Sequence, residues 1–360
     1  MFGLSGKYES LAEKVDRSQR LSRDEASVLA GAPLALLGLL ASRVKERKSG
    51  REVYYNRNFH IEPTNICVFN CRFCSYRRPA GASDAWDYSE EEILAQVEAH
   101  RDSGATEIHI VGGVHPQHDI YYYADLIRKV KRILPQASVK AFTAIELAYM
   151  IDKAGLTPHD GLALLKEAGM EAIPGGGAEI FDEAIRARIC PEKGSSETWL
   201  AMHREAHRIG ISTNATILYG HVENWEHRID HLDRLRTLQD ETGGFNAFIP
   251  LKYRSRHNSM SEVGEVSVVE DMRMTALARV YLDNFPHIKA YWPMFGTAQI
   301  ALAFGADDMD GTIDDSTKIY SMAGAEDQSP AMTAADMERL IRDAGYLPVE
   351  RDTFYNPVKK

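Results

Sequence analysis

Residues 67–74 read CVFNCRFC, so three cysteines lie within eight residues at the spacing C-x3-C-x2-C. The 360-residue chain contains only one other cysteine, Cys190. Three thiolates held close together can ligate three irons of a four-iron cluster, whereas an ordinary electron-transfer cluster has four cysteine ligands. The fourth iron then keeps an open position at which a substrate or cofactor can bind. The spacing therefore predicts a catalytic [4Fe-4S] cluster ligated by Cys67, Cys71 and Cys74.

Two simpler interpretations fit these cysteines less well. A structural zinc site needs four ligands, and the only nearby nitrogen donor, His60, stands seven residues before Cys67, unlike the paired units of zinc sites. A disulfide framework fails because three clustered cysteines cannot all pair with one another. Cys190 is more typical of a packed small side chain than of a fourth ligand. We therefore expect the cluster to cleave S-adenosylmethionine reductively to a carbon radical.

The composition is that of a large cytoplasmic enzyme. Apolar residues make up 44% and charged residues 26% of the chain, enough for a substantial core. The net charge of −10 argues against nucleic-acid binding. The apolar run 28–44 is shorter than the ~20 residues that span a bilayer and contains Gly31, Pro33 and Gly38, so we expect no membrane segment. The few cysteines and the lack of a signal peptide suit the reducing cytoplasm.

Strand-like and helix-like segments alternate through most of the chain. Repeated βα units over about 250 residues predict an α/β fold, a TIM-like (β/α) barrel. A doubly wound open sheet is the alternative that periodicity leaves open. We expect N-terminal helices in residues 1–50, the barrel core in 51–300 and a C-terminal extension in 301–360. The expected strands are 58–66, 107–112, 138–144, 171–174, 212–219, 246–253 and 287–293; the expected helices are 89–103, 122–134, 145–168, 179–188, 196–209, 225–242 and 269–284.

The chemistry of such barrels lies at the carboxyl ends of the strands, and polar or glycine-rich residues follow several of them here. The cysteine loop follows the first strand, and residues 112–116 (GGVHP) and 175–179 (GGGAE) follow the second and fourth. On the first strand His60, Glu62 and Thr64 alternate with apolar residues and share one face. We expect this face to line the site, although it could instead contact the outer helices.

Several longer strings resemble the radical S-adenosylmethionine superfamily, and within it the futalosine branch of menaquinone biosynthesis. They extend from about residue 54 to 356, and no single one carries the resemblance. The strings are HIEPTNIC (60–67), AFTA (141–144), VGGVHP (111–116), PGGGAE (174–179), NATILYGH (214–221), QDETGGF (239–245) and AYWPM (290–294).

The resemblance implies a set of cofactor contacts. The aromatic Tyr76, beside the third cysteine, would lie against the adenine, and Gly112 and Gly113 would bind the methionyl amine. Other polar residues near strand ends complete the expected S-adenosylmethionine site: Glu146, Glu179 and Asn214.

The reaction implied for this branch is addition of the 5′-deoxyadenosyl radical to 3-[(1-carboxyvinyl)oxy]benzoate, with rearrangement and decarboxylation to 6-amino-6-deoxyfutalosine. S-adenosylmethionine would be consumed, and an electron donor such as flavodoxin or ferredoxin would reduce the cluster. A dicarboxylate in a dry pocket needs charged or donor contacts. The candidates for these contacts are His115, His221, Lys252 and Arg254, and we expect His60 and Glu62 to take part in catalysis.

Two alternatives remain open at this stage. A sister reaction of the branch uses the same radical for hydrogen abstraction and cyclisation of dehypoxanthine futalosine. An iron–sulfur electron-transfer protein without S-adenosylmethionine chemistry is the other, and the loops at the strand ends speak against it.

Overall fold

The computed structural model describes residues 6–293, 296–313, 322 and 331–358. Three helices come first: α1 (Gly6–Asp16), α2 (Arg23–Ala30) and α3 (Leu34–Ser49). A capping box formed by Ser22 and Glu25 starts α2, because each side chain bonds the other's backbone N–H. None of the helices in the described part of the chain is long and apolar enough to cross a membrane.

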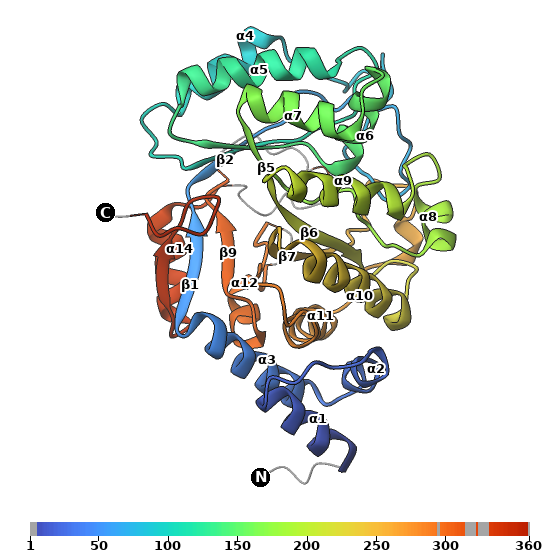
Figure 1. The fold of residues 1–360 in the computed structure, drawn as a ribbon, viewed down its shortest axis with the longest axis vertical. Helices are drawn as coiled ribbons and strands as arrows, with labels where there is room; N and C mark the ends of the chain where they lie inside the picture. Colours follow the sequence, from blue (N-terminus) through green and yellow to red (C-terminus); the bar gives the residue numbers. More distant parts are fainter. Residues whose placement is uncertain (1–5, 294–295, 314–321, 323–330, 359–360) are drawn as a thin grey trace.

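A parallel sheet of seven strands forms the centre of the molecule, and its strand order follows the chain, from β2 to β8. Sequential order with every neighbour parallel is the topology of a barrel, whereas a doubly wound sheet reverses its order at a switch point. The sheet curls without closing on itself, and helices cover its outer face (Figure 1). The strands are β2 (Asn58–Ile61), β3 (Glu107–Ile110), β4 (Ser138–Ala141), β5 (Met170–Ile173), β6 (Ser212–Tyr219), β7 (Phe245–Lys252) and β8 (His287–Ile288).

The helices between these strands follow the expected alternation, but several expected elements are divided or shorter; the expected strand 287–293, for example, pairs in the sheet only over His287–Ile288. The outer helices are α4 (Glu90–Ala99), α5 (Ile120–Ile133), α6 (Ala144–Lys153), α7 (Pro158–Ala168), α8 (Glu183–Ile189), α9 (Ser196–Arg208), α10 (Trp225–Thr242) and α11 (Val268–Tyr281). The expected helix 145–168 is two helices, because Thr157 caps a new one whose first residue is Pro158. The expected strand 58–66 ends at Ile61, since Pro63 has no N–H for a ladder.

The gap between β8 and β2 is filled by β9 (Asp308–Gly311). Its start bonds to β8, with Asp307 N–H donating to the Ile288 carbonyl at 3.0 Å. Its far end reaches β2, where Ile313 N–H donates to Asn58 Oδ1 at 2.8 Å. A side chain at Gly311 would overlap the Asn58 side chain, so glycine is required at this contact.

A second, three-stranded sheet joins the C-terminal extension to the start of the barrel. β1 (Glu52–Asn56) pairs in parallel with both β9 and β10 (Leu347–Glu350). The other helices in the described part of the chain include 3-10 turns at Ser261–Val263 (η1) and Leu302–Phe304 (η2), α12 (Ala298–Ala301) and α14 (Ala334–Asp343). Met294 of the 290–294 string and parts of the expected extension lie outside the described residues.

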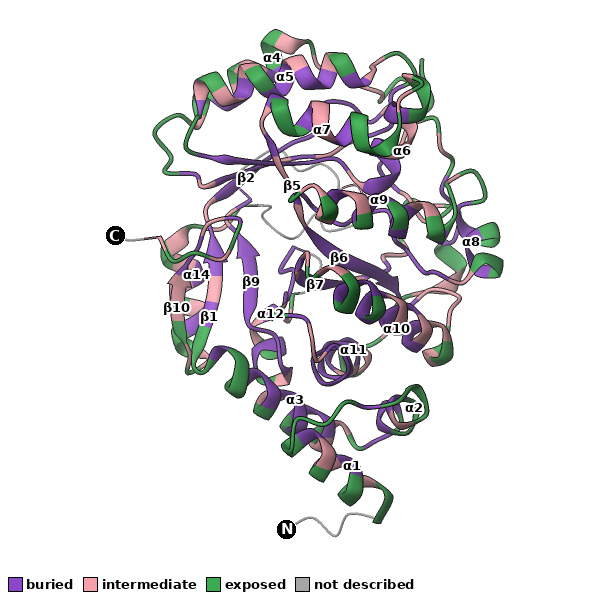
Figure 2. Cartoon of the chain, in the orientation of Figure 1, coloured by how far each residue is buried: buried purple, intermediate pink, exposed green. Residues whose placement is uncertain are grey.

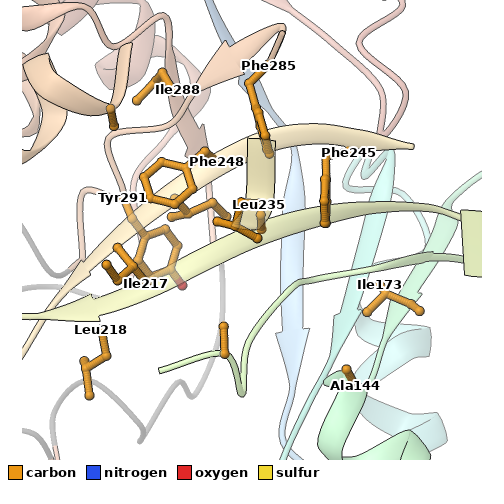
Figure 3. Close-up of a cluster of buried hydrophobic side chains, with 14 of the residues drawn as sticks. Ala144, Ile173, Ile217, Leu218, Leu235, Phe245, Phe248, Phe285, Ile288 and Tyr291 are labelled. Carbon is orange, nitrogen blue, oxygen red and sulfur yellow. The ribbon is translucent and has the colours of Figure 1, made fainter. Parts of the chain in front are cut away.

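The strands of the seven-stranded sheet are mostly buried and the outward faces of the helices are exposed (Figure 2), whereas β10 at the edge of the second sheet is largely half-buried or exposed. Between the sheet and α10 and α11, the rings of Phe245 and Phe285 stack at 5.3 Å, and Phe248 meets Phe285 edge-on at 6.3 Å (Figure 3). Leu235 from α10 packs into the same cluster. This apolar layer fixes the outer faces of β6 and β7, so that their alternate residues point to the barrel interior.

Candidate functional site

The cysteine loop lies beyond the carboxyl end of β2 and is held by backbone bonds to distant segments. Val68 N–H donates to the Val114 carbonyl at 3.0 Å, and Arg72 N–H donates to the Ile189 carbonyl at 2.8 Å. Cys71 is buried and the other two cysteines of residues 67–74 are half-buried; all are free thiols. The loop is therefore fixed from two sides while its thiols stay at the end of the barrel where chemistry is expected.

The donor set fits an iron–sulfur cluster better than a single ion. Among the described residues, the sulfurs of residues 67–74 do not form a group in which all ligand atoms lie within 4.8 Å of one another, as the ligands of one Zn²⁺ would. Burial raises the pKa of the Cys71 thiol to about 12, so that a metal's positive charge would be needed to hold it as thiolate. Arg77 N–H donates to Cys74 Sγ at 3.4 Å, the kind of bond that cluster sulfurs accept.

Gly112 and Gly113 follow β3 and lie directly against the segment that leads into the cysteine loop. Gly113 N–H donates to the Thr64 carbonyl at 2.7 Å. A Cβ on Gly113 would overlap the Ile66 carbonyl, and one on Gly112 would stand 2.8 Å from the Thr64 oxygen. The two glycines thus allow β3 to support the cysteine loop, a packing requirement that exists with or without a bound ligand.

Tyr76 and Glu62 lie together under the cysteine loop. Tyr76 is buried, donates its hydroxyl proton to the Thr64 carbonyl at 3.1 Å and meets Trp86 edge-on at 5.3 Å. Burial, and after it the nearby Glu62 carboxylate, raises the pKa of Tyr76. The phenol is therefore a neutral donor, and its ring has a fixed orientation at the mouth of the barrel.

Glu146 joins the ends of two strands. One oxygen accepts the Thr143 N–H at 2.7 Å in a capping box at the start of α6, and the other accepts the Gly112 N–H at 3.3 Å. Burial raises the pKa of this carboxyl. Its contacts give Glu146 a structural task, and contact with a cofactor stays a prediction.

Glu179 forms a buried ion pair with Lys193, a residue that sequence reasoning missed. Glu179 has the left-handed backbone conformation at φ +49°, which is strained for a residue with a side chain. Burial lowers the pKa of Lys193, but Glu179 and Cys71 outweigh it and raise the pKa. The structure thus brings a firmly protonated ammonium close to Cys71, one of the expected cluster ligands.

His115 lies in a cluster with Asp87 and His118 whose ligand atoms are within 4.8 Å of one another. Its Nδ1 accepts backbone N–H bonds from Gln117 at 3.2 Å and from His118 at 3.3 Å. In a neutral imidazole the proton must then be on Nε2, which faces Asp87 at 3.6 Å. That tautomer has no lone pair on Nε2 for a metal, and His115 serves better as a donor.

His221 and Lys252 have strong protein partners. His221 Nε2 donates to the Leu218 carbonyl at 3.0 Å, and burial lowers the pKa of the ring. Lys252 pairs with Asp271 on the outer helix α11 at 3.0 Å. The cavity-lining Leu251 of the same strand alternates with Lys252, which therefore points away from the barrel interior.

Arg254, the remaining expected substrate contact, lies 3.5 Å from Glu265 in the loop that follows β7. Its role in substrate binding stays a prediction.

A cavity of about 170 Å³ lies inside the barrel and extends to the carboxyl ends of the strands. Its upper rim includes Val111, Thr143 and Gly176, each near the end of a different strand. A wider hollow of about 440 Å³, lined by Arg57 and His100 among others, opens at the amino ends, where barrel enzymes carry no catalytic groups. The full lining of the inner cavity is His109, Val111, Lys140, Thr143, Pro174, Gly176, Asn214, Thr216, Ile249, Leu251, Lys289, Tyr291 and Asp310.

Charged groups form the floor of this inner cavity. Lys140 Nζ lies 2.5 Å from Glu107 Oε1, and Lys289 Nζ lies 2.5 Å from Asp310 Oδ1. His60 on β2 lies beside His109 on β3, with 3.3 Å between His60 Nε2 and His109 Nδ1. Burial lowers the pKa of His60 to about 4.

His60 contacts His109, which lines the cavity, and Asn214 lines the cavity itself. Sequence reasoning missed His109, Lys140, Lys289 and Asp310. The alternation test applied to the first strand would have found three of them, because His109, Lys140 and Lys289 each stand between apolar residues of an expected strand.

The sequence matches the radical SAM superfamily over residues 61–235 and the CofH/MqnC C-terminal region over residues 242–360. It is 44% identical to the aminodeoxyfutalosine synthase of Thermus thermophilus over 97% of this chain and 95% of that protein. The synthase of Streptomyces coelicolor is 40% identical, over 99% and 95% of the two chains. A 5-amino-6-(D-ribitylamino)uracil–L-tyrosine 4-hydroxyphenyl transferase of Methanothermobacter thermautotrophicus is 35% identical, over 94% and 95%.

Solved structures agree on the fold. The FeFe-hydrogenase maturase HydG of Carboxydothermus hydrogenoformans superposes with a TM-score of 0.76 at 18% identity, over 97% of this chain and 80% of that one. Methylornithine synthase, PylB, gives 0.72 at 16% identity, over 94% and 97%.

Proposed function

This chain belongs to the radical S-adenosylmethionine superfamily, in the family that includes the aminodeoxyfutalosine synthases, and we propose that it catalyses their reaction. The observation that carries the proposal is the 44% identity that extends over nearly the whole of both chains, so that barrel and C-terminal region match together. The cofactors of the superfamily, a [4Fe-4S] cluster and S-adenosylmethionine, fit the three free thiols beside the mouth of the inner cavity.

The proposed reaction joins the 5′-deoxyadenosyl group to 3-[(1-carboxyvinyl)oxy]benzoate and, after rearrangement and loss of carbon dioxide, gives 6-amino-6-deoxyfutalosine. Cys67, Cys71 and Cys74 would hold the cluster, which would supply the electron for cleavage of the sulfonium of S-adenosylmethionine. The apolar walls of the cavity exclude water from the reactive carbon.

The remaining site residues divide between the two ligands. Tyr76 and the backbone at Gly112 and Gly113 border the S-adenosylmethionine side, because they lie against the cysteine loop. Asn214 is available from the cavity wall, and Glu179 from the strained loop after β5.

On the substrate side, His115 offers a protonated Nε2 at the mouth, and Arg254 carries a charge on the loop after β7. The neutral His60 is available for proton transfer from below, and Glu62 from beneath the cysteine loop.

An anaerobic assay with adenosyl-labelled S-adenosylmethionine, a chemical reductant and the enolpyruvyl benzoate tests the proposal. We expect the label in a product that also contains the benzoate skeleton. Label found only in free 5′-deoxyadenosine would contradict it and favour the cyclase reaction. Turnover of L-tyrosine with 5-amino-6-(D-ribitylamino)uracil in place of the benzoate would instead assign the reaction named for the methanogen relatives.

We also propose an electron donor, a cellular compartment and a role for each segment of the chain. A small flavodoxin or ferredoxin serves as the electron donor, and the acidic protein binds no nucleic acid. The enzyme works in the cytoplasm, where four unpaired cysteines stay reduced. Residues 1–50, 51–300 and 301–360 act as helical segment, catalytic barrel and extension.

A further inference from the structure

We propose that Lys140 and Lys289 form a carboxylate-binding floor in the barrel cavity, and that the ring carboxylate of the substrate binds to it. The inference rests on the proposed function, which supplies a substrate with a carboxylate at each end.

The two ammonium groups belong to opposite parts of the sheet and meet at the same cavity. Lys140 is in the middle of β4 and Lys289 directly follows β8; their side chains are only 6% and 2% exposed. Both line the inner cavity. A lysine is rarely buried so fully without a partner, so each of these positions needs a reason beyond packing.

The protein provides acceptors for only part of the hydrogen-bonding capacity of each ammonium group. An ammonium has three hydrogens to donate, and among the described residues each lysine meets one carboxylate, Glu107 for Lys140 and Asp310 for Lys289. Burial lowers the pKa of Lys140, Glu107 opposes this, and the neighbouring charge of Lys289 lowers it further. A carboxylate ligand shared by the two lysines would remove that repulsion and add charge-assisted hydrogen bonds.

The strand β9, which carries Asp310, is also held in an unusual conformation at this residue. Asp310 has φ +69°, and its backbone N–H donates to Asp308 Oδ1 at 2.5 Å. Trp292 Nε1 donates to the neighbouring Gly311 carbonyl at 2.8 Å. Residues kept in this strained region cluster at ligand sites, and here the strain directs a carboxylate onto Lys289.

The shape of the cavity indicates which end of the substrate binds the floor. Besides the lysines and Val111 at the rim, the cavity is lined by Ile249, Leu251 and Tyr291, a wall suited to an aromatic ring. The vinyl carbon that receives the adenosyl group must face the cysteine loop at the mouth. The ring carboxylate is at the other end of the molecule, and so it points to the floor.

The test measures binding to the reconstituted holoenzyme by calorimetry under anaerobic conditions. The ligands are 3-[(1-carboxyvinyl)oxy]benzoate and two analogues, one with the ring carboxylate and one with the enolpyruvyl carboxylate converted to the amide. We expect Lys140→Met and Lys289→Met each to weaken binding of the dicarboxylate by roughly 30-fold or more, as loss of one partner of a buried charge pair does. The ring amide should bind wild type weakly, and Lys289→Met should no longer distinguish it from the acid.

Lys131→Met is the matched control, since Lys131 also pairs with a glutamate, Glu171 at 2.9 Å, but on the outside of the barrel. It should bind all three ligands as wild type does. Because Lys289→Met leaves Asp310 buried without its partner, the double variant Lys289→Gln with Asp310→Asn gives a second, charge-balanced measurement. Iron content and cleavage of S-adenosylmethionine without substrate report whether each variant is intact.

Wild-type affinity for the dicarboxylate in the intact lysine variants would overturn this inference alone. The same holds if the loss of affinity caused by the lysine substitutions disappears for the enolpyruvyl amide instead of the ring amide. A wild-type enzyme that cleaves S-adenosylmethionine but does not bind the dicarboxylate overturns the proposed function and this inference together.

Discussion

The mouth and the floor of the barrel cavity are built in opposite ways. The mouth takes its three thiols from eight consecutive residues, and its support comes from backbone contacts of Gly113 and Val114. The floor takes single side chains from β3, β4, β9 and the residue after β8, and it is held by ion pairs such as Lys140 with Glu107. A cluster can therefore be recognised from local spacing, whereas a substrate floor exists only once the strands are side by side.

The mouth and the floor also differ in their charged groups. At the mouth, the charged pair Lys193–Glu179 lies near Cys71, but burial dominates and raises the pKa of the Cys71 thiol, which the positive charge of iron would lower. At the floor, each positive charge already has a negative partner, so the network is close to neutral without a ligand. Substitutions at the mouth should therefore remove the reaction as a whole, while those at the floor should change substrate binding and stability.

The largest expected effect is at the three thiols. Cys67→Ala, Cys71→Ala and Cys74→Ala should each abolish product and lower iron after reconstitution from about four atoms per chain to well under half of that. Cys190→Ala is the matched control: its thiol is buried, burial raises its pKa to about 11, and it should keep both iron and activity. A folded but iron-poor Cys190 variant would contradict the three-cysteine assignment.

These two regions also show how far the sequence could be interpreted without a structure. The order of strands and helices was predictable, because each βα unit carries its own periodicity. The end of β2 at Ile61 was missed, since the polar alternation continues through Pro63 although the ladder cannot. Lys289 lies in the expected strand 287–293, of which only His287–Ile288 pairs in the sheet, and its position between apolar residues was overlooked. Asp310 was missed because its place beside β8 depends on a contact between distant segments.

A slightly smaller effect is expected where Gly113 supports the cysteine loop. Gly113→Ala would place a methyl group on the Ile66 carbonyl, so the cysteine loop must move or the end of β3 must. We expect a loss of about 1–3 kcal/mol in the free energy of unfolding, or more, together with poor iron retention. Gly194→Ala is the control, because its Cβ would make an ordinary 3.6 Å contact with Thr198. Equal iron content in the two variants would mean that the loop does not depend on this contact.

A smaller effect is expected from the polar residues between mouth and floor. His60→Ala and Glu62→Ala should keep iron near the wild-type level, because neither is a ligand, and should still produce 5′-deoxyadenosine without substrate. Product formation should fall by about 10²-fold if these groups move protons. The pH profile of product formation distinguishes this from a structural role, since a proton-transfer group shifts the profile. Full activity in both variants would show that this face takes no part in the reaction.

The smallest effect concerns stability and pH at the floor. Burial lowers the pKa of His60 from 6.5 to about 4, so between these pH values His60 is protonated in the unfolded chain but neutral in the folded protein. The contribution of His60 to stability is therefore complete above pH 6.5 and is lost as the pH falls from there toward 4.

The free energy of unfolding should consequently fall by up to about 1.4 kcal/mol per pH unit for this residue, in addition to what His207 and His231 contribute in the same direction. Urea unfolding between about pH 7 and pH 5 measures how steeply the free energy of unfolding depends on pH. His60→Asn should make this dependence shallower by the contribution of one titrating group, whatever the variant does to overall stability. An unchanged slope would mean that His60 is reached by water, and that the floor is less dry than the burial of Lys140 and Lys289 indicates.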